Sequence, residues 1–438
     1  METNSKICSR AKSSSRKFNH SDGLRLHRSS SVKLLLFCSF VGLLGGPVLF
    51  AQESRDEARA SKQRKLLLAH YMPWYQAKPY SNVWGWHWTM NKFDPEREQK
   101  GDSSESAKRQ IASHFYPVIG PYDSADPATL ECQLLQMKLA GIDGVIVDWY
   151  GLTDLHDYAI LHQCTEKLIT QAQKLGMRFA ICYEDSTIPA LTRAGRLSES
   201  GRVKHAISEI SWLAENWFNR NGYVHLDGKP VLLSFGQDGL SDSEWTLCLR
   251  GVDRSLSYFS EHQKRSAAIG AFDWPIPSEG LAGVTRFEAN ARAWPESIAV
   301  AFPRFVDIYA EAGLHQSWGR IEDQQGAVFR QTLNRAFGSK SKLIQIATWN
   351  DWGEGTQIEP SREFGYRDLE IIQQVRRAET GGAFTIQAGD LRLPVDLLNQ
   401  RRRLPEGNAA SELDQIAVQL SQGKVEEARR RLRNYSAR

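Results

Sequence analysis

The sequence predicts an α/β fold, a (β/α)8 TIM-type barrel with a small helical C-terminal extension. Two observations predict this fold. Short apolar runs alternate with helical patterns along residues 66–378, as expected for parallel strands that are buried on both faces. The strong apolar runs also end in aromatic, acidic or amide residues, and the C-terminal ends of barrel strands are where barrel enzymes build their active sites.

The predicted strands and helices follow from these patterns. Strong strand runs lie at 66–72, 145–147, 179–182, 231–235 and 343–347, and weaker ones lie at 267–272 and 298–302. The eighth strand of the barrel has no obvious run. Helical patterns cover 128–140, 158–175 and 203–218. A doubly wound nucleotide-binding sheet is disfavoured, because no glycine-rich phosphate loop follows the first run.

The N-terminal segment has the order of an export signal. A basic, polar stretch precedes the apolar residues 34–50 and the small residue Ala51. We therefore expect a signal peptide over 1–51, a mature protein that begins near Gln52, and an exported, periplasmic or extracellular location. Membrane contact is expected only if this segment stays uncleaved. Residues 52–65 are charged and are interpreted as a linker.

The C-terminal extension, residues 379–438, departs from the barrel pattern. Residues 384–386 are strand-like, and 411–422 and 424–434 predict a helical hairpin. The hairpin's shared apolar face consists of Leu413, Ile416, Leu420, Val425, Ala428 and Leu432.

The composition narrows the class of function. The net charge is only +4, and the basic excess lies at the two ends of the chain, so no nucleic-acid partner is expected. Many of the 13 tryptophans stand beside Gly, Asp, Asn or His, where aromatic rings can stack on sugars. The tryptophan-rich segment 82–88 is expected to be a loop too polar for the core. The cysteines lack metal-ligand spacing, although one or two disulfides are possible, and no metal or other cofactor is expected.

The segment 350–360 carries the strongest chemical signal. Asp351, Glu354 and Glu359 lie within nine residues, directly after an apolar run. Glycosidic cleavage uses two carboxyl groups that flank the scissile bond, one of them held protonated near neutral pH. Gly353 and Gly355 would allow a bend that turns Asp351 and Glu354 into one cleft. These two residues are the predicted catalytic pair.

The segment 349–359, Trp-Asn-Asp-Trp-Gly-Glu-Gly-Thr-Gln-Ile-Glu, resembles the signature of glycoside hydrolase family 99. Segments 71–75, 117–127 and 144–151 match the family in the same order, and the similarity spans residues 66–370. The resemblance implies a barrel that cleaves within α-mannose-type glycans, with retention and without a metal. Asp351 would deprotonate the sugar's 2-hydroxyl, which attacks the anomeric carbon, and Glu354 would protonate the leaving oxygen and later activate water.

Two departures from the family leave the substrate open. The well-known members have Glu where this chain has Asp351, and a hydroxyl residue where it has Asp148. An Asp carboxylate sits about one bond length further back, and a displacement of about 1 Å can lower a rate on the order of a hundredfold. A non-catalytic glycan-binding barrel is therefore one alternative. A polysaccharide-assembly protein is another, which predicted export and the lack of a nucleotide motif disfavour.

The remaining candidates are aromatic and polar residues around the predicted strand ends, which we expect to bind an oligosaccharide or polysaccharide. They are Tyr71, Trp74, Tyr75, Asp148, Trp149, Tyr150, Glu184, Asp185, Asn350, Trp352, Gln357 and Glu359.

Overall fold

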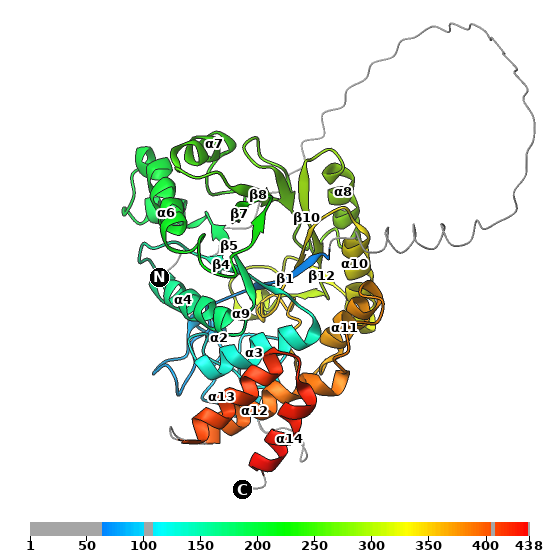
Figure 1. Cartoon of the computed structure of the whole chain (residues 1–438). Helices are drawn as coiled ribbons and strands as arrows, with labels where there is room; N and C mark the ends of the chain where they lie inside the picture. The colour runs from blue at the N-terminus through cyan, green and yellow to red at the C-terminus, as the bar shows by residue number, and fades with distance from the viewer. Residues whose placement is uncertain (1–63, 100–107, 404–407, 437–438) are drawn as a thin grey trace, which may run out of the picture. The chain divides into compact units, whose positions relative to one another are not determined.

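Eight parallel strands form a closed barrel in which each strand pairs with the next one along the chain (Figure 1). The computed structural model describes residues 64–99, 108–403 and 408–436. The barrel closes where β13 pairs with β1, so the predicted barrel is confirmed. Its strands are β1 (Leu66–Tyr71), β4 (Gly144–Trp149), β5 (Arg178–Glu184), β7 (Lys229–Phe235), β8 (Ser257–Glu261), β9 (Gly270–Phe272), β10 (Glu296–Ala301) and β13 (Leu343–Ile346).

Helices connect most of the strands on the outside of the barrel. The larger ones are α3 (Pro127–Ala140), α4 (Tyr158–Lys174), α6 (Arg202–Asn216), α7 (Asp242–Gly251), α8 (Leu281–Ala291), α10 (Ala327–Gly338) and α11 (Arg367–Glu379). Shorter helices are α2 (Trp86–Thr89), α5 (Thr187–Arg193), α9 (Tyr309–Ala312), η1 (Glu199–Gly201) and η2 (Gln324–Gly326). Short strands outside the barrel are β2 (Glu98–Gln99), β3 (Lys108–Arg109), β6 (His225–Leu226), β11 (Phe305–Val306) and β12 (Arg320–Ile321).

The strand that the sequence did not reveal is β8. Its residues Ser257-Tyr258-Phe259-Ser260-Glu261 are all buried, although three of the five are polar. The Ser257 hydroxyl donates to Leu226 O at 3.1 Å, and the hydroxyls of Ser234 and Tyr258 lie 2.8 Å apart. Because hydrogen bonds satisfy these groups, the strand can be buried without an apolar run to mark it.

Two apolar layers explain why the strand runs are continuous. Leu68, Ile146 and Leu233 pack inside the barrel, whereas Leu67 and Val145 pack against the surrounding helices. Successive side chains of a strand point to opposite faces, so both faces of these strands are buried.

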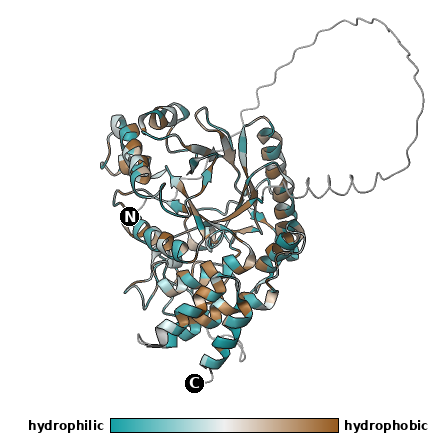
Figure 2. Cartoon of the chain, viewed as in Figure 1, coloured by the Kyte–Doolittle hydropathy of each residue, from teal (hydrophilic) through white to brown (hydrophobic). Residues whose placement is uncertain are grey.

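The C-terminal extension packs on the barrel through α3, and both belong to one compact unit (Figure 1). It consists of η3 (Ala388–Arg392), α12 (Leu393–Arg403), α13 (Asn408–Ser421) and α14 (Val425–Ser436). The predicted hairpin is confirmed as α13 and α14. Its apolar face is buried, except for the partly buried Val425, and Figure 2 shows hydrophobic residues along these helices among hydrophilic ones.

Three expectations about individual segments are corrected or refined. Residues 384–386 form no strand, since the closed barrel offers no free edge beside them. Trp88, in the segment expected to be too polar for the core, is fully buried, because its indole donates to Tyr122 O at 2.8 Å. All four cysteines in the described part of the chain are buried and unpaired.

The predicted signal peptide and nearly all of the linker lie outside the described residues. Within the described ranges, no helix has both the length and the apolar character needed to cross a membrane.

Candidate active site

A cavity of about 200 Å³ lies at the C-terminal ends of the barrel strands. This volume is smaller than a typical drug-binding pocket and suits one sugar unit rather than a whole chain. Seven of the predicted site residues line it: Trp74, Tyr75, Asp148, Tyr150, Glu184, Asp351 and Glu354. The sequence did not identify the other lining residues as site residues: His70, Met72, Trp86, His87, Met90, Phe235, Trp274, Tyr309 and Gly353.

A tight turn after β13 presents Asp351 and Glu354. The Asp351 N–H donates to the Thr348 hydroxyl at 2.8 Å, and the Glu354 N–H donates to Asp351 Oδ1 at 3.0 Å. Gly355 has a φ of +67°, and a Cβ there would lie 2.7 Å from Val306 O. The bend therefore requires glycine at Gly355, as the sequence predicted.

Asp351 and Glu354 have different surroundings although both are buried. Burial raises the pKa of Asp351 to about 7, with a further rise from Asp148, while hydrogen bonds from the backbone N–H groups of Glu354 and Gly353 oppose that rise. Burial, and then the charge of Asp351, raise the pKa of Glu354 well above its ordinary value. Glu354 Oε2 has no hydrogen-bond partner. Asp351 thus loses its proton more readily than Glu354, and this difference suits a base and an acid.

Two further carboxyl groups face the same cavity. Asp148 and Glu184 lie at the ends of the neighbouring strands β4 and β5. Burial, and then the charge of Asp148, raise the pKa of Glu184 well above its ordinary value. The lining residues therefore include four carboxyl groups, together with two histidines, but no Lys or Arg.

Aromatic side chains form much of the remaining wall. The rings of Trp74 and His87 stack with centroids 4.2 Å apart and an interplanar angle of 3°, and His87 Nε2 lies 3.6 Å from Asp157. Tyr309 lies near Asp351 and Glu354, since the charges of both add to the rise that burial causes in its pKa. Aromatic faces beside carboxylates are the groups that sugar recognition requires.

Three predicted binding residues lie behind the wall rather than in the cavity. The Tyr71 hydroxyl donates to Gln133 Oε1 at 2.6 Å, and the Trp149 indole donates to His162 Nδ1 at 3.2 Å. Asp185 Oδ2 accepts from the Trp245 indole at 2.7 Å and from the Leu240 N–H at 3.1 Å. Protein groups use these polar atoms, so we expect no direct sugar contact from these residues.

Four residues of the predicted motif also point away from the cavity. Asn350 Oδ1 accepts from the Met72 N–H at 2.8 Å, and the Trp352 indole donates to Glu359 Oε2 at 3.1 Å. Glu359 accepts two more bonds, from the Tyr122 hydroxyl at 2.8 Å and from Gln133 Nε2 at 2.7 Å. The side-chain amide of Gln357 is buried without a partner. Asn350, Trp352 and Glu359 thus bond to protein groups around the turn. None of the four residues lines the cavity.

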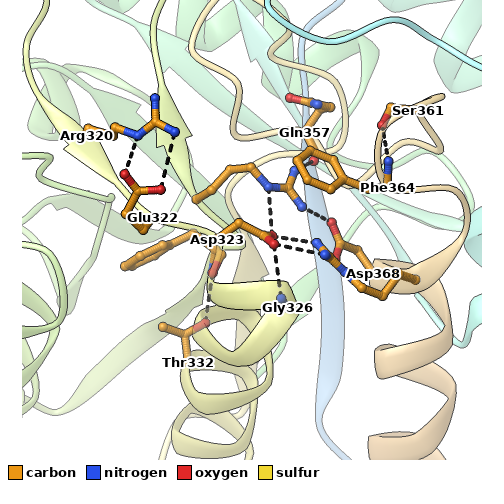
Figure 3. A network of polar contacts seen from close by, with 12 residues as sticks. Arg320, Glu322, Asp323, Gly326, Thr332, Gln357, Ser361, Phe364 and Asp368 are labelled. Carbon is orange, nitrogen blue, oxygen red and sulfur yellow. Dashed lines mark hydrogen bonds and ion pairs between the residues drawn. The ribbon is translucent and has the colours of Figure 1, made fainter.

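A buried charge network supports the turn from the side of α11 (Figure 3). Arg304 donates to Gln357 O at 2.7 Å and to Asp323 Oδ1 at 3.1 Å, and it also pairs with Asp368. Its guanidinium carbon lies 3.8 Å from the centroid of the Phe364 ring. This network links the segment that follows the turn after β13 to the start of η2 and to α11.

The cavity-lining residues that the sequence analysis did not predict had only weak signals in the sequence. His70 lies inside the apolar run of β1, and an ionisable residue one position before the strand's last residue was the only sign. Tyr309 follows a predicted strand that was itself weak, so nothing placed it at a strand end. Contacts between segments far apart in the sequence bring both residues to the cavity.

The chain is similar to known proteins in its sequence and in its fold. The profile of glycosyl hydrolase family 99 matches residues 63–194. The mouse glycoprotein endo-alpha-1,2-mannosidase is 31% identical over 327 residues, which cover 67% of each chain. The human glycoprotein endo-alpha-1,2-mannosidase-like protein is 23% identical over 325 residues, 67% of this chain and 68% of the relative. The chain thus spans about two thirds of the length of these relatives.

Solved structures support the same fold. Two structures of the GH99 endo-alpha-mannosidase from Bacteroides thetaiotaomicron align with TM-scores of 0.55 and 0.52, at 17% and 18% identity. The alignments cover 72% and 77% of this chain and 98% of each of those chains. The relative at 31% identity over two thirds of each chain, together with the family profile, shows that this chain belongs to glycoside hydrolase family 99 and is a glycoside hydrolase.

Proposed function

We propose that this chain is an exported, endo-acting and retaining hydrolase of α-mannoside-type glycans, with Asp351 and Glu354 as its catalytic pair. The observation that carries the proposal is that one turn presents both carboxyl groups to one cavity in different surroundings. Two carboxyl groups on a scissile bond, one ionised and one protonated, are what glycosidic cleavage needs.

In the first step, Asp351 removes the proton from the 2-hydroxyl of the sugar in the cavity. The 2-oxygen then attacks the anomeric carbon, and the bond to the leaving oxygen breaks as Glu354 gives that oxygen its proton. A 1,2-anhydro sugar results. In the second step, Glu354 takes a proton from water and the water oxygen attacks the anomeric carbon. The bond between that carbon and the 2-oxygen breaks, and Asp351 returns a proton to the 2-oxygen. Two displacements at one carbon leave its configuration unchanged.

The proposed substrate class rests on the relatives and on the cavity. The mammalian relatives are named endo-alpha-1,2-mannosidase or endo-alpha-1,2-mannosidase-like protein, and the cavity suits one sugar unit beside aromatic walls. Asp148 faces the same space, and its carboxylate accepts hydrogen bonds from sugar hydroxyls. A single unit in the cavity with further sugars on either side is compatible with cleavage inside a chain.

The proposal is tested with α-mannoside oligosaccharides and with 2-deoxy analogues that keep the same leaving group. We expect early-time NMR of the products to show the α-anomer, and we expect the 2-deoxy analogue to be inert because it lacks the internal nucleophile. Rapid turnover of the 2-deoxy analogue with a trapped ester on Asp351 would instead make Asp351 a direct nucleophile. An early β-anomer would overturn retention.

Export is proposed from the order of basic, apolar and small residues in the first 51 positions. N-terminal sequencing of protein recovered outside the cytoplasm should begin near Gln52. Protein that keeps Met1 in a membrane fraction would show an anchor instead.

A further inference from the structure

Three side chains that can bind a metal meet at the floor of the cavity. His70 lies on β1, Asp148 on β4 and Cys182 on β5, and one ligand atom from each lies within 4.8 Å of the other two. Asp148 and Cys182 are direct partners in the β4–β5 ladder. All three residues are buried, and each lies two positions beyond a residue of the barrel interior (Leu68, Ile146 and Ala180), so all three face inward.

The hydrogen bonds of Gln345 fix the protonation of the His70 ring. Gln345 Nε2 donates to Asp273 O at 3.3 Å, so its Oε1 is the atom that lies 3.4 Å from His70 Nδ1. An amide oxygen only accepts hydrogen bonds, so Nδ1 carries a proton. In the neutral ring, Nε2 is then an unprotonated lone pair.

That lone pair faces another acceptor. His70 Nε2 lies 4.0 Å from Asp148 Oδ1, and neither atom has a hydrogen-bond partner. Burying two acceptors without a donor between them is unfavourable, because each atom loses its hydrogen bond to water and gains none in the protein. A metal ion between them would satisfy both, and so would a second proton on His70. The thiol of Cys182, the third ligand in reach, favours the metal.

We propose that His70, Asp148 and Cys182 bind a zinc ion at the floor of the cavity. Imidazole, carboxylate and thiolate together are a zinc ligand set rather than one for magnesium or calcium. A tetrahedral zinc ion separates its ligand atoms by roughly 3.5 Å, so the side chains need to close by about 1 Å. His70 and Asp148 line the cavity, so the fourth position faces it and is open to water or a sugar hydroxyl.

The surroundings suit a cation. Asp148, Glu184, Asp351 and Glu354 line the cavity without a Lys or Arg, and a divalent ion would offset their charge. Burial, and then the charge of Asp148, raise the pKa of the Cys182 thiol well above its ordinary value. Zinc would bind the thiolate and release the thiol proton to solvent, so zinc affinity should rise with pH. The sequence could not reveal this site, because each ligand comes from a different strand.

The test measures metal in tag-free protein. After chelator treatment and return of equimolar zinc, we expect about one zinc ion per chain by elemental analysis. Cobalt in its place should give a thiolate-to-cobalt absorption band. Cys182→Ser should abolish that band, and Cys182→Ser and His70→Gln should each weaken zinc binding at least a hundredfold. Gln345→Leu, which removes the hydrogen bond to Nδ1, should weaken it about ten- to a hundredfold.

Cys164→Ser is the matched control. Cys164 is also buried, but it lies on α4 outside the barrel, and its replacement should leave metal binding unchanged. The zinc site would be overturned if wild-type protein bound neither zinc nor cobalt, or if Cys182→Ser bound them equally well. The alternative would then be a second proton on His70 that bonds to Asp148. The cobalt band of the wild type needs no variant, so a variant that fails to fold does not prevent the test. Hydrolysis is assayed in parallel: active, metal-free protein would refute only the zinc site, and inactive zinc protein would refute only the proposed function.

Discussion

The carboxyl groups on the two sides of the turn after β13 differ in their hydrogen bonding. On the cavity side, Glu354 is 9% exposed and its Oε2 has no hydrogen-bond partner. On the other side, Glu359 is 3% exposed and accepts bonds from Tyr122, Gln133 and Trp352. Both glutamates are buried and both have raised pKa values, about 7 for Glu359, so burial alone does not separate them. Their hydrogen bonds do separate them: the acid with an unbonded oxygen lines the cavity, and the acid with three donors lies among protein groups on the other side of the turn.

The first test replaces each cavity-side carboxyl group with an amide of the same shape. Glu354→Gln should lower hydrolysis of glycans with poor leaving groups about a hundred- to ten-thousandfold, because general acid catalysis supplies that much. Substrates with activated leaving groups should suffer less in the first step. Asp351→Asn should impair both kinds of substrate alike. Steady-state kinetics on the two substrate types measures the difference.

Stability is the control for these two variants. In Asp351→Asn the side-chain carbonyl can still accept from the Glu354 N–H, so the turn keeps this hydrogen bond. Urea denaturation should show that both variants are folded. If both amide variants kept full activity, the catalytic site would move to Asp148 and Glu184.

The second test acts on the opposite side of the turn. Glu359→Ala leaves the donors of Tyr122 and Gln133 buried without an acceptor, and each such donor costs about 1–3 kcal/mol. It also leaves the Trp352 indole with only a 3.4 Å bond to the Tyr122 hydroxyl. We expect the free energy of unfolding to fall by about 3 kcal/mol or more, as measured by urea denaturation. Glu426→Ala, on an 80% exposed side chain, should change it by less than about 0.5 kcal/mol. A fully stable Glu359→Ala protein would show that these bonds do not hold the turn.

This comparison also shows what the sequence could predict. The apolar runs predicted seven of the eight barrel strands, because a strand that is buried on both faces usually consists of consecutive apolar residues. The motif identified the segment with Asp351 and Glu354, but not the direction of its side chains. Asn350, Trp352 and Glu359 carry the same chemical groups as a sugar site, and only their partners from other strands and loops show that they face the other way.

Contacts between distant segments account for the remaining gaps. His70 and Tyr309 line the cavity although they lie far apart in the sequence. In β8, polar residues are buried because their hydroxyls are hydrogen-bonded, so the sequence has no apolar run there. Single-sequence patterns record local periodicity, so a partner that is far away in the sequence leaves no mark on them.

The third test concerns the buried network behind the turn (Figure 3). Arg304→Met removes the bonds to Asp323, Asp368 and Gln357 O, and should lower the free energy of unfolding by about 3–5 kcal/mol, since it leaves buried acceptors unpaired. Arg320→Met is the matched control. Arg320 and Glu322 form an exposed pair nearby, whose loss should change stability by about 1 kcal/mol or less. Equal effects from the two substitutions would refute a supporting role for the network.

The smallest expected effect comes from Asp185, a predicted binding residue that the structure places behind the cavity wall. Burial raises its pKa from the ordinary 3.8 to about 7, against the opposing hydrogen bond from Trp245. Between about pH 4 and pH 7 the folded state therefore keeps a proton that the unfolded state has released, so this group's contribution to stability falls as pH rises.

Asp185→Asn should remove that dependence, because the Asn carbonyl still accepts from Leu240 and Trp245 while its amide takes the place of the unpartnered Oδ1. In urea denaturation, the variant and the wild type should be about equally stable at pH 4. The variant should be more stable at pH 8, on the order of 2–4 kcal/mol. Hydrolysis at pH 7 should stay within about twofold of the wild type, since Asp185 does not line the cavity. A large loss of activity with unchanged stability would show that Asp185 contributes to substrate binding, even though protein groups already donate hydrogen bonds to it.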